Sequence, residues 1–264
     1  MMKKEHGDTY VSKYDKSIHL DINKIYQGDC LELMNGIPDK SVDMILCDLP
    51  YGTTACKWDT IIPFDRLWCQ YERVIKDNGA IVLFGSEPFS SKLRMSNIKN
   101  YKYDWIWDKN KGSNYASAKY MPLKIHETIS VFSKGNKRVD YYPVMREGKM
   151  RNKKSYSKGG GVYGSLKSDG KDIYNNLYYP VSILNYSNAR QKGKVHPTQK
   201  PVPLIEYLIK TYTNEGETVL DNCIGSGTTA IAALNTGRYF IGIEKEKEYV
   251  DIANKRVEEI KQPV

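Results

Sequence analysis

Short, nearly continuous hydrophobic runs mark the first third of the chain. Val42–Cys47 (VDMILC) and Ala80–Phe84 (AIVLF) have the length of strands and lack the one-sided spacing of a surface helix. Runs of this kind are typical of parallel strands that are covered on both faces. The two segments therefore predict a parallel sheet with helices on both of its sides.

The residues around these runs predict the rest of the first half. Phe64–Lys76 carries hydrophobic residues at helical spacing, and Asp77-Asn78-Gly79 has the composition of a helix stop. Trp105–Trp107 and Thr128–Phe132 predict two further strands. The second of them closes the first half of the fold.

Strands and helices alternate again in the last quarter of the chain. Alternation on both sides of an interruption predicts one doubly wound α/β sheet that is assembled from both ends of the chain. The expected elements are a helix at Pro201–Tyr212, a strand at Thr218–Asp221, a helix at Ser226–Asn235, a strand at Tyr239–Glu244 and a helix at Lys245–Lys261.

Composition narrows the class of protein. The 264 residues are 40% hydrophobic, which suffices for a full-sized core. No hydrophobic run approaches the roughly 20 residues of a membrane-spanning helix, and the first residues lack a signal-peptide core. The five cysteines form no Cys-x-x-Cys pair, and the histidines do not cluster. We therefore expect a soluble cytoplasmic protein with reduced, mostly buried thiols and no metal site.

Positive charge is concentrated in the middle of the chain. Lys109–Lys200 contains 19 Lys and Arg against 5 Asp and Glu, whereas acidic residues are in excess elsewhere. The same segment holds ten of the 21 tyrosines and the basic run Arg146–Lys158. Basic residues interleaved with Tyr, Asn and Ser suit contacts to nucleic-acid phosphates and bases. A solvated surface insertion fits the charge equally well.

A glycine-rich turn follows one of the late strands. Asp221–Thr229 (DNCIGSGTT) runs from a strand into a helix, and its glycines let the backbone approach a ligand closely. The turn lacks the Lys-Ser/Thr of a phosphate-binding loop and the spacing of the dinucleotide fingerprint. Glu244 closes the next strand, where an acid can bind a ribose hydroxyl, although such a glutamate is also common at a solvated strand end. Together the two features favour an adenosine-containing ligand without a triphosphate.

Four motifs in a fixed order carry a family resemblance. They are Asp48-Leu49-Pro50-Tyr51, His196–Pro201 (HPTQKP), the Asp221–Thr229 turn and Glu244. The set resembles the S-adenosylmethionine-dependent DNA amino-methyltransferases, the N-4/N-6 DNA methylase family. The order, with the Asp-x-Pro-Tyr motif ahead of the glycine turn, is similar to the permuted β group of that family. The likeness extends over most of the chain, from about residue 26 to residue 256.

The resemblance implies a fold and a division of the chain. The fold is α/β, a Rossmann-like methyltransferase fold with a doubly wound, mostly parallel, seven-stranded sheet and circularly permuted motifs. Residues 1–108 and 195–264 would form the catalytic and cofactor-binding domain. Residues 109–194 would form a basic, loop-rich target-recognition insertion, which also supplies a final strand of the catalytic sheet near 128–133.

By resemblance, the first motif carries the catalysis. The exocyclic amine of adenine is a poor nucleophile, because its lone pair is delocalised into the ring. Asp48 and the backbone carbonyl of Leu49 would accept hydrogen bonds from this amine. Tyr51 would stack on the base after it has left the duplex, and Pro50 would stiffen the turn. The methyl group would then pass directly to N6, without a cysteine nucleophile.

The same resemblance assigns the S-adenosylmethionine site. Asp29 would contact the adenine of the cofactor, Glu244 its ribose, and Asp221 with Asp48 its ammonium group. Two alternatives stay open: Asp29 also suits the N-cap of the following helix, and HPTQKP also suits a rigid turn. The expected cofactor-binding residues are Asp29, Cys30, Asp48, Thr198, Lys200, Asp221, Cys223, Gly225, Ser226, Gly227, Thr228 and Glu244.

Two positions depart from the family pattern. Leu49 replaces the commoner proline, but the working group there is a backbone carbonyl, which leucine retains. The glycine turn begins Asp221-Asn222-Cys223 instead of Asp-Pro-Phe, so an aromatic contact near the cofactor is missing. The acid at Asp48 favours adenine N6, because relatives that act on cytosine N4 more often use serine.

The resemblance also gives the basic middle segment a role, with double-stranded DNA as the partner and no membrane. Lys and Arg within Arg146–Lys158 would contact phosphates, and Asn114, Tyr115 and Asn175 are candidates for base contacts. The loop Gly52–Asp59 would close over the flipped base, with Trp58 as either a base contact or a core anchor.

Other acceptors and partners stay open at this point. The amine acceptor could instead be cytosine N4, an RNA base or a protein glutamine, and a nucleic-acid-binding module without activity is a further alternative. A second copy of the chain, in a homodimer, is an additional expected partner. Two biological settings also stay open: a restriction-modification system with a cognate restriction endonuclease, or a solitary enzyme.

Overall fold

The computed structural model of the chain describes residues 19–54, 56, 59–135, 138–153, 173–188 and 199–261. Its strands are β1 (Lys24–Gln27), β2 (Val42–Cys47), β3 (Ile75–Gly85), β4 (Tyr101–Ser113), β5 (Lys124–Ser133), β6 (Arg146–Lys153), β7 (Ile173–Tyr178), β8 (Ile183–Asn185), β9 (Thr218–Asp221) and β10 (Tyr239–Glu244). Its α-helices are α1 (Cys30–Leu33), α2 (Phe64–Val74), α3 (Phe89–Ser96), α4 (Val202–Tyr212), α5 (Thr228–Asn235) and α6 (Lys247–Lys261), and short 3-10 helices lie at Met34–Gly36 and Tyr115–Ser117.

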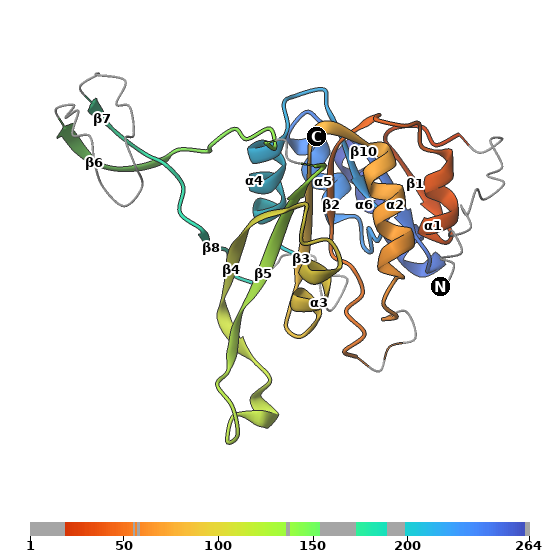
Figure 1. Cartoon of the computed structure of the whole chain (residues 1–264), viewed down its shortest axis with the longest axis horizontal. Coiled ribbons are helices and arrows are strands. Elements are labelled where there is room, and N and C mark those ends of the chain that lie inside the picture. The colour runs from red at the N-terminus through yellow and green to blue at the C-terminus, as the bar shows by residue number, and fades with distance from the viewer. Residues whose placement is uncertain are drawn as a thin grey trace, which may run out of the picture.

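One mixed sheet organises the fold. Its strand order is β1-β10-β9-β2-β3-β5-β4-β8, and the strands from β1 to β3 run parallel (Figure 1). Strand β5 is antiparallel to both of its neighbours, and β4 pairs with β8 in parallel. The expected α/β, mostly parallel sheet is therefore present, with both halves of the chain contributing. It has eight strands instead of seven, because β8 adds at the edge beside β4.

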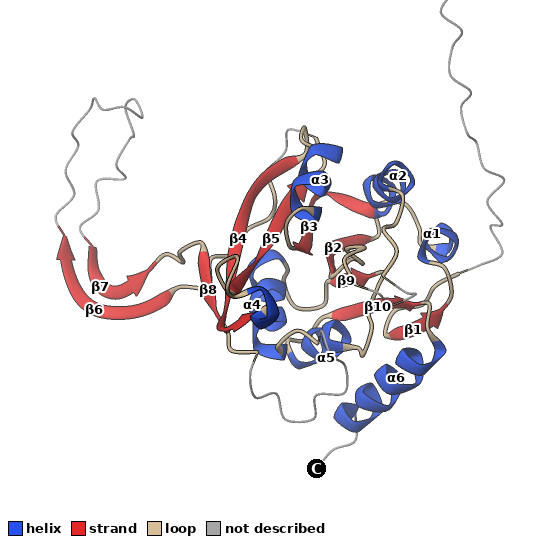
Figure 2. Ribbon diagram, turned by 90° about the horizontal axis from the view of Figure 1, so that it is seen from below, coloured by secondary structure: helices blue, strands red, loops and turns tan. Residues whose placement is uncertain are grey.

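Helices cover both faces of this sheet, as the hydrophobic runs predict. Helices α1, α2 and α3 pack on one face and α4, α5 and α6 on the other (Figure 2). In α2, Leu67, Tyr71 and Val74 are fully buried at helical spacing, so one stripe of the helix enters the core. The strand β2 is buried along its whole length, which explains its unbroken hydrophobic sequence.

The end of α2 differs from the prediction. The helix ends at Val74 instead of Lys76, and β3 begins at once, so Asp77-Asn78-Gly79 lies inside a strand and is not a helix stop. Strand β3 bulges at this point. Val42 of β2 pairs with Ile75 and Met44 pairs with Ala80, so the register shifts between the two pairs. Burial of Ile75 beside β2 outweighs the local turn preference of the Asp-Asn-Gly sequence.

Other boundaries differ by smaller amounts. Strands β2, β9 and β10 have the predicted bounds, and α4 begins one residue late. Helix α5 begins at Thr228 and α6 at Lys247, each two residues later than predicted. Strands β4 and β5 extend well beyond the predicted cores Trp105–Trp107 and Thr128–Phe132, because they pair with each other as a long hairpin.

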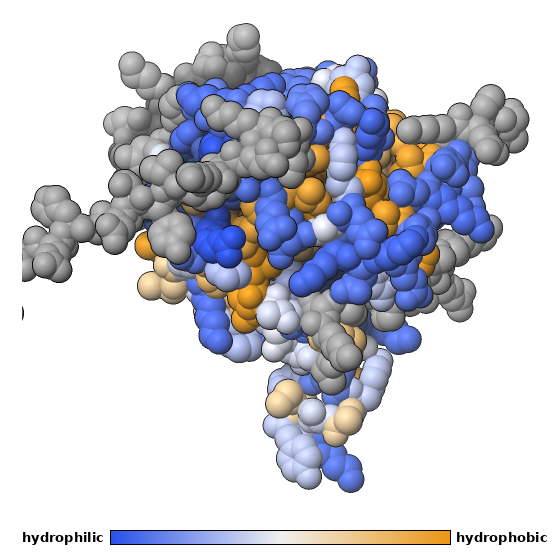
Figure 3. Space-filling model, turned by 90° about the vertical axis from the view of Figure 1, so that its right-hand side faces the viewer, coloured by the Kyte–Doolittle hydropathy of each residue, from blue (hydrophilic) through white to orange (hydrophobic). Residues whose placement is uncertain are grey.

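Two hairpins project from the body of the molecule (Figure 1). One is the outer part of β4 and β5, which Figure 3 shows as the lower projection, largely hydrophilic with a few hydrophobic residues. The other is the antiparallel pair β6–β7, which belongs to a separate two-stranded sheet. Strands β5 and β8 and the end of β4, although within residues 109–194, pair in the main sheet.

Within the described residues, we find no helix that is both long and hydrophobic enough to cross a membrane.

Candidate active site

Four neighbouring strands of the sheet deliver a carboxylate to the same edge. Glu244 and Asp221 are the last residues of β10 and β9, Asp48 follows β2 directly, and Asp29 comes two residues after β1. The strands are parallel and adjacent in the order β1, β10, β9, β2, so their carboxyl ends meet. Ligands of open α/β sheets bind outside these carboxyl ends.

All four carboxylates line one cavity of about 620 Å³. This volume lies in the range of small-molecule binding sites. Gly227 does not line the cavity, and Thr198 lies outside the described residues, as do His196 and Pro197. The expected site residues that line it are Asp29, Cys30, Asp48, Leu49, Pro50, Tyr51, Lys200, Asp221, Cys223, Gly225, Ser226, Thr228 and Glu244.

The glycine turn is held by Glu244. The backbone N–H of Gly225 donates to Glu244 Oε2 at 2.9 Å, and that of Glu246 donates to Oε1 at 2.8 Å. Gly225 has a φ of +52°, and an added Cβ would meet no atom within 4 Å. Each carboxylate oxygen of Glu244 retains a lone pair for a further donor. Burial raises the pKa of Glu244 above its usual value.

Gly227 has a packing function instead. It is the N-cap of α5 in the left-handed region, with a φ of +83°. A Cβ there would lie 2.9 Å from the Ala253 Cβ and 3.1 Å from its Cα. The residue therefore lets α6 approach the start of α5, and only a glycine fits without strain.

Asp221 is a buried carboxyl with few donors. Thr229 Oγ1 donates to its Oδ2 at 2.6 Å, and the backbone N–H of Cys223 donates to Oδ1 at 3.1 Å. Burial raises its pKa to about 6, because these hydrogen bonds and a contact with the Cys47 thiol do not compensate for lost hydration. Such a carboxyl favours a cationic ligand, which would restore its ionised form.

Asp29 forms the N-cap of α1. Its Oδ1 accepts a hydrogen bond from the backbone N–H of Leu31 at 2.9 Å. The capping alternative is therefore correct, and a ligand contact through the same side chain remains a prediction. The following helix is short: α1 gives way to a 3-10 turn at Met34.

All five cysteines are free, and Cys30 and Cys47 both lie beside Cys223 of the glycine turn. Cys30 and Cys47 are buried and Cys223 is half-buried, whereas Cys56 and Cys69 are exposed, so burial is less general than expected. Burial raises the pKa of Cys47 to about 12, which keeps this thiol neutral near pH 7.

Asn222, where the family pattern has proline, has a structural partner. Its Oδ1 accepts a hydrogen bond from the buried Tyr71 hydroxyl at 2.5 Å. The polar residue thus ties the turn to α2, on which Tyr71 lies.

Asp48 and Tyr51 contact each other directly. The Tyr51 hydroxyl donates to Asp48 Oδ1 at 2.6 Å. The Tyr51 ring stacks on Phe89 of α3, with centroids 4.9 Å apart and planes inclined by 27°. Leu49, which lies between the two residues in the sequence, is almost completely buried and also lines the cavity.

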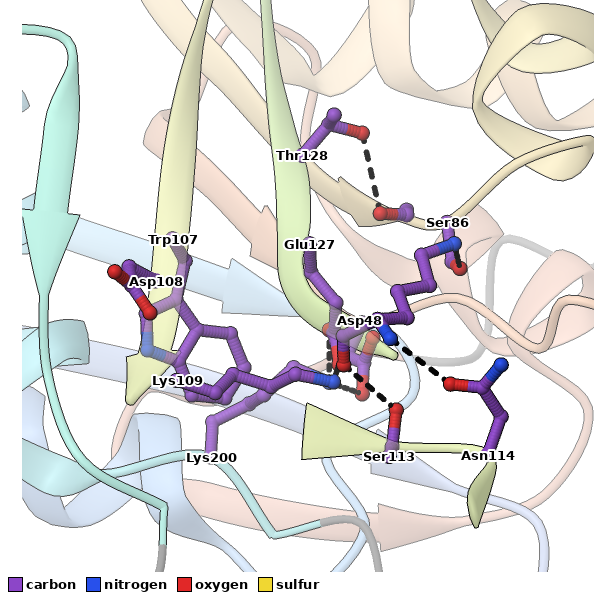
Figure 4. A network of polar contacts seen from close by, with 12 residues as sticks. Asp48, Ser86, Trp107, Asp108, Lys109, Ser113, Asn114, Glu127, Thr128 and Lys200 are labelled. Atoms are coloured by element: carbon purple, nitrogen blue, oxygen red, sulfur yellow. Dashed lines mark hydrogen bonds and ion pairs between the residues drawn. The ribbon is translucent and has the colours of Figure 1, made fainter. Parts of the chain in front are cut away.

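Asp48 also belongs to a cluster of four charges (Figure 4). The Lys200 ammonium lies 2.5 Å from Asp48 Oδ2 and 3.3 Å from Glu127 Oε2. On the other side, the Lys109 ammonium lies 3.3 Å from Glu127 Oε1. All four side chains line the cavity and come from separate parts of the chain.

Sequence reasoning missed Glu127 and Lys109. Glu127 immediately precedes the predicted strand Thr128–Phe132, so it does not follow a hydrophobic run as the other strand-end acids do. Because β5 is antiparallel, its beginning lies at the carboxyl edge of the parallel strands, beside Asp48. No local signal marks Glu127, because the sequence around it does not specify the direction of β5 relative to β3.

Asp59 shapes the loop after Tyr51. Its carboxylate accepts hydrogen bonds from the backbone N–H groups of Gly52, Thr53 and Thr54 at 2.7 to 2.9 Å. Although burial opposes ionisation, these donors hold the pKa of Asp59 below its usual value. The predicted loop is thus anchored at both ends, and Trp58 lies outside the described residues.

The candidate DNA-contacting residues lie on the projecting hairpins. Asn114 and Asn175 are engaged locally: Asn114 Oδ1 accepts from the Lys124 backbone, and Asn175 Oδ1 accepts from Arg151 Nε and the Leu177 backbone. Tyr115 is exposed. Of the basic run, only Arg146–Lys153 lies within the described residues.

Comparison with known families gives one match over most of the chain. The model of the N6_N4_Mtase family, described as DNA methylase, matches residues 42–255. Among curated proteins, the Type II methyltransferase M1.MboII of Moraxella bovis is 32% identical, over 89% of this chain and 96% of its own. The Type II methyltransferase M.BglII of Bacillus subtilis is 31% identical, over 88% and 68%.

Two solved structures are similar to this chain over most of its length. The crystal structure of the M1.HpyAVI–SAM complex has a TM-score of 0.58 at 26% identity, covering 88% of this chain and 98% of that chain. The cytosine-N4-specific PvuII DNA methyltransferase has a TM-score of 0.63 at 18% identity, covering 90% and 87%. The second likeness concerns the fold alone.

Proposed function

The chain belongs to the N6_N4_Mtase family of DNA methylases, and from this premise we propose that it transfers a methyl group from S-adenosylmethionine to the N6 amino group of adenine in DNA. The observation that carries the proposal is the position of Asp48, a carboxylate that lines the cavity beside Tyr51 at the end of β2. It stands in one row with three further carboxylates that suit a cationic cofactor.

S-adenosylmethionine is the cofactor, and the residues of the cavity fit it. It carries an ammonium and a sulfonium charge, and the buried Asp221 and the half-buried Glu244 are acceptors that such a ligand would satisfy. Gly225 offers open space beside Glu244 for a ribose. When bound, the cofactor supplies an electrophilic methyl group on a positively charged sulfur. Asp29 is proposed to contact the adenine of the cofactor, in addition to the N-cap hydrogen bond that it already accepts.

Asp48 acts on the target base as a hydrogen-bond acceptor. The exocyclic amine donates to Asp48 and to the Leu49 carbonyl, which draws its lone pair out of the ring and toward the methyl donor. Tyr51 holds the flipped base by stacking, with its other face supported by Phe89. The chain positions the reactants and supplies electrostatic stabilisation, and no covalent intermediate with a side chain is needed. The neutral Cys47 thiol is consistent with this.

Cytosine N4 is the second candidate acceptor. The fold accommodates this chemistry, since the structurally similar PvuII enzyme is described as cytosine-N4-specific. The carboxylate at position 48 supports adenine, because the resemblance associates serine with cytosine.

Double-stranded DNA is the proposed partner. The projecting part of the β4–β5 hairpin leaves the body of the molecule beside the cavity, which Lys109 and Ser113 line. Beyond these residues it carries the exposed Tyr115 and Tyr120. Residues 109–194 are proposed as the target-recognition region. Homodimer formation, a cognate restriction endonuclease and a cytoplasmic location stay predictions.

The test is to incubate DNA with the protein and methyl-labelled S-adenosylmethionine and to identify the modified nucleoside by mass spectrometry. We expect N6-methyladenine. Labelled N4-methylcytosine would favour the second candidate over the proposal. If no label is transferred to genomic DNA of varied sequence, both candidates are overturned.

A further inference from the structure

The charge cluster at the end of the cavity poses a problem for the proposed role of Asp48. One of its oxygens accepts from the Tyr51 hydroxyl, and the other lies 2.5 Å from the Lys200 ammonium. A carboxylate that is paired with an ammonium group is a weaker acceptor for a neutral amine, because its negative charge is already compensated. A base amino group that arrives at Asp48 must therefore compete with Lys200.

Lys200 cannot simply leave the protein interior. Its side chain is only 9% exposed, and its ammonium lies over the rings of Phe84 and Trp107, at 5.1 and 5.8 Å from their centroids. Burial disfavours its charged form, but Asp48 and Glu127 together raise the pKa of Lys200 above its usual value. A buried ammonium that loses one anion needs another within reach.

Glu127 provides that second anion. Its Oε2 is buried and accepts no hydrogen bond from any described residue, although the Lys200 ammonium is 3.3 Å away (Figure 4). A buried carboxylate oxygen without a donor is unfavourable and uncommon. Its other oxygen is paired with Lys109, which fixes the side chain from the opposite side. A small shift of the Lys200 ammonium would complete the missing hydrogen bond.

We propose that Glu127 is a positioning residue that takes over the Lys200 ammonium when the target amino group binds Asp48. The inference rests on the proposed function, since it assumes that an amine donates to Asp48. Lys200 thus moves between two carboxylates that both lie within reach in the present arrangement, and Asp48 Oδ2 becomes free to accept from the base. Lys109 holds Glu127 in place throughout.

The decisive variant is Glu127→Gln, which keeps the shape and removes the charge. Lys200 is then left with Asp48 as its sole anionic partner among the four charges, and Asp48 stays occupied. We expect kcat for methyl transfer to fall by about 10- to 100-fold, the size of one hydrogen bond to a charged group. The Kd of S-adenosylmethionine, measured by titration without DNA, stays within about twofold. Glu127→Asp, which retains the charge, recovers part of kcat.

A double-mutant cycle with Lys200→Met tests whether Glu127 acts through Lys200. In the Lys200→Met background, Glu127→Gln should have almost no further effect on kcat, because the group it positions is gone. The matched control is Asp104→Asn, which breaks another ion pair of β4, with Arg94, outside the cavity and should leave kcat unchanged.

Three outcomes overturn the inference. The first is a wild-type kcat in the Glu127→Gln variant. The second is a loss of kcat on Glu127→Gln that is as large in the Lys200→Met background as in the wild type, which would indicate that Glu127 contacts the substrate directly. Equal losses in kcat and cofactor affinity would indicate a structural role. In all three cases the wild-type protein still methylates DNA; if it does not, the proposed function fails as well.

Discussion

The Tyr51 hydroxyl donates a 2.6 Å hydrogen bond to Asp48 Oδ1, while the ring of the same residue stacks on Phe89. The side chain thus has two separable functions, one in orienting the carboxylate and one in offering an aromatic face. A motif that reads as a single unit in the sequence combines a polar and an apolar interaction in the structure.

Substitutions at Tyr51 should separate these functions. Tyr51→Phe retains the stack and loses the hydroxyl, so we expect kcat to fall by less than about tenfold. Tyr51→Ala removes the face on which the base stacks, which is worth about 1–3 kcal/mol. Steady-state kinetics with DNA should therefore rank the variants wild type, Phe, Ala. Equal activity of the Ala variant and the wild type would rule out the stacking role.

Asp48→Ala should abolish methyl transfer and leave S-adenosylmethionine binding largely intact. The proposed acceptor of the base amine is lost, whereas Asp221 and Glu244 remain at the cofactor side of the cavity. Transfer of label to DNA and a cofactor titration would be measured on the same preparation. Normal turnover in this variant would refute the proposed mechanism.

Cofactor affinity should rise with pH between about 5 and 7. Burial raises the pKa of Asp221 to about 6, so below that pH the carboxyl is neutral and must lose its proton to pair with an ammonium group. Binding then releases a proton, and affinity improves by at most about tenfold per pH unit until Asp221 is ionised.

The matched control for this pH dependence is Asp221→Asn. This variant should bind about 10- to 100-fold more weakly at pH 7.5 and should lose most of the rise between pH 5 and 7. Isothermal titration in buffers of different ionisation enthalpy would count the released protons. An unaltered pH profile in Asp221→Asn would assign the titration to another group.

Gly227→Ala should destabilise the protein more than Gly216→Ala. Both residues have positive φ, +83° and +78°, so both substitutions carry the left-handed penalty of roughly 1 kcal/mol. Only at Gly227 would the new Cβ also meet Ala253 of α6, whereas Gly216 faces open space. We expect an additional loss of about 1–3 kcal/mol at Gly227, visible in chemical unfolding. Equal losses would contradict the proposed contact between α5 and α6.

DNA affinity should depend steeply on salt. Arg146 and Lys149 lie exposed on β6, within the basic middle segment. If they contact phosphates, Lys149→Ala should weaken binding for all sequences and lower the slope of log K against log salt by roughly 1. The control is Lys24→Ala on β1, at the far edge of the sheet, which should change neither quantity. A flat salt dependence of the wild-type protein would exclude phosphate neutralisation.

The sequence by itself determined the class of fold and most of the row of carboxylates. Hydrophobic runs such as Val42–Cys47 are long and unbroken because both faces of the strand are buried. Buried positions carry hydrophobic residues, so this pattern is visible in the sequence itself. Asp48, Asp221 and Glu244 could be identified because each follows such a run directly, and a strand end in a parallel sheet has only one edge to reach.

Only the tertiary structure decided which charges meet. Glu127 joins Asp48 because β5 runs antiparallel to β3, and local sequence carries no record of strand direction. Asp77-Asn78-Gly79 has the local preferences of a turn but lies in β3, because the burial of Ile75 next to β2 is a long-range effect. The sequence predicts Gly227 to be a ligand-binding glycine, whereas the structure shows that it is needed for the packing of α6 against the start of α5. Short-range preferences are weak compared with the packing of elements distant in the chain, so pairings of this kind become known only when the fold is assembled.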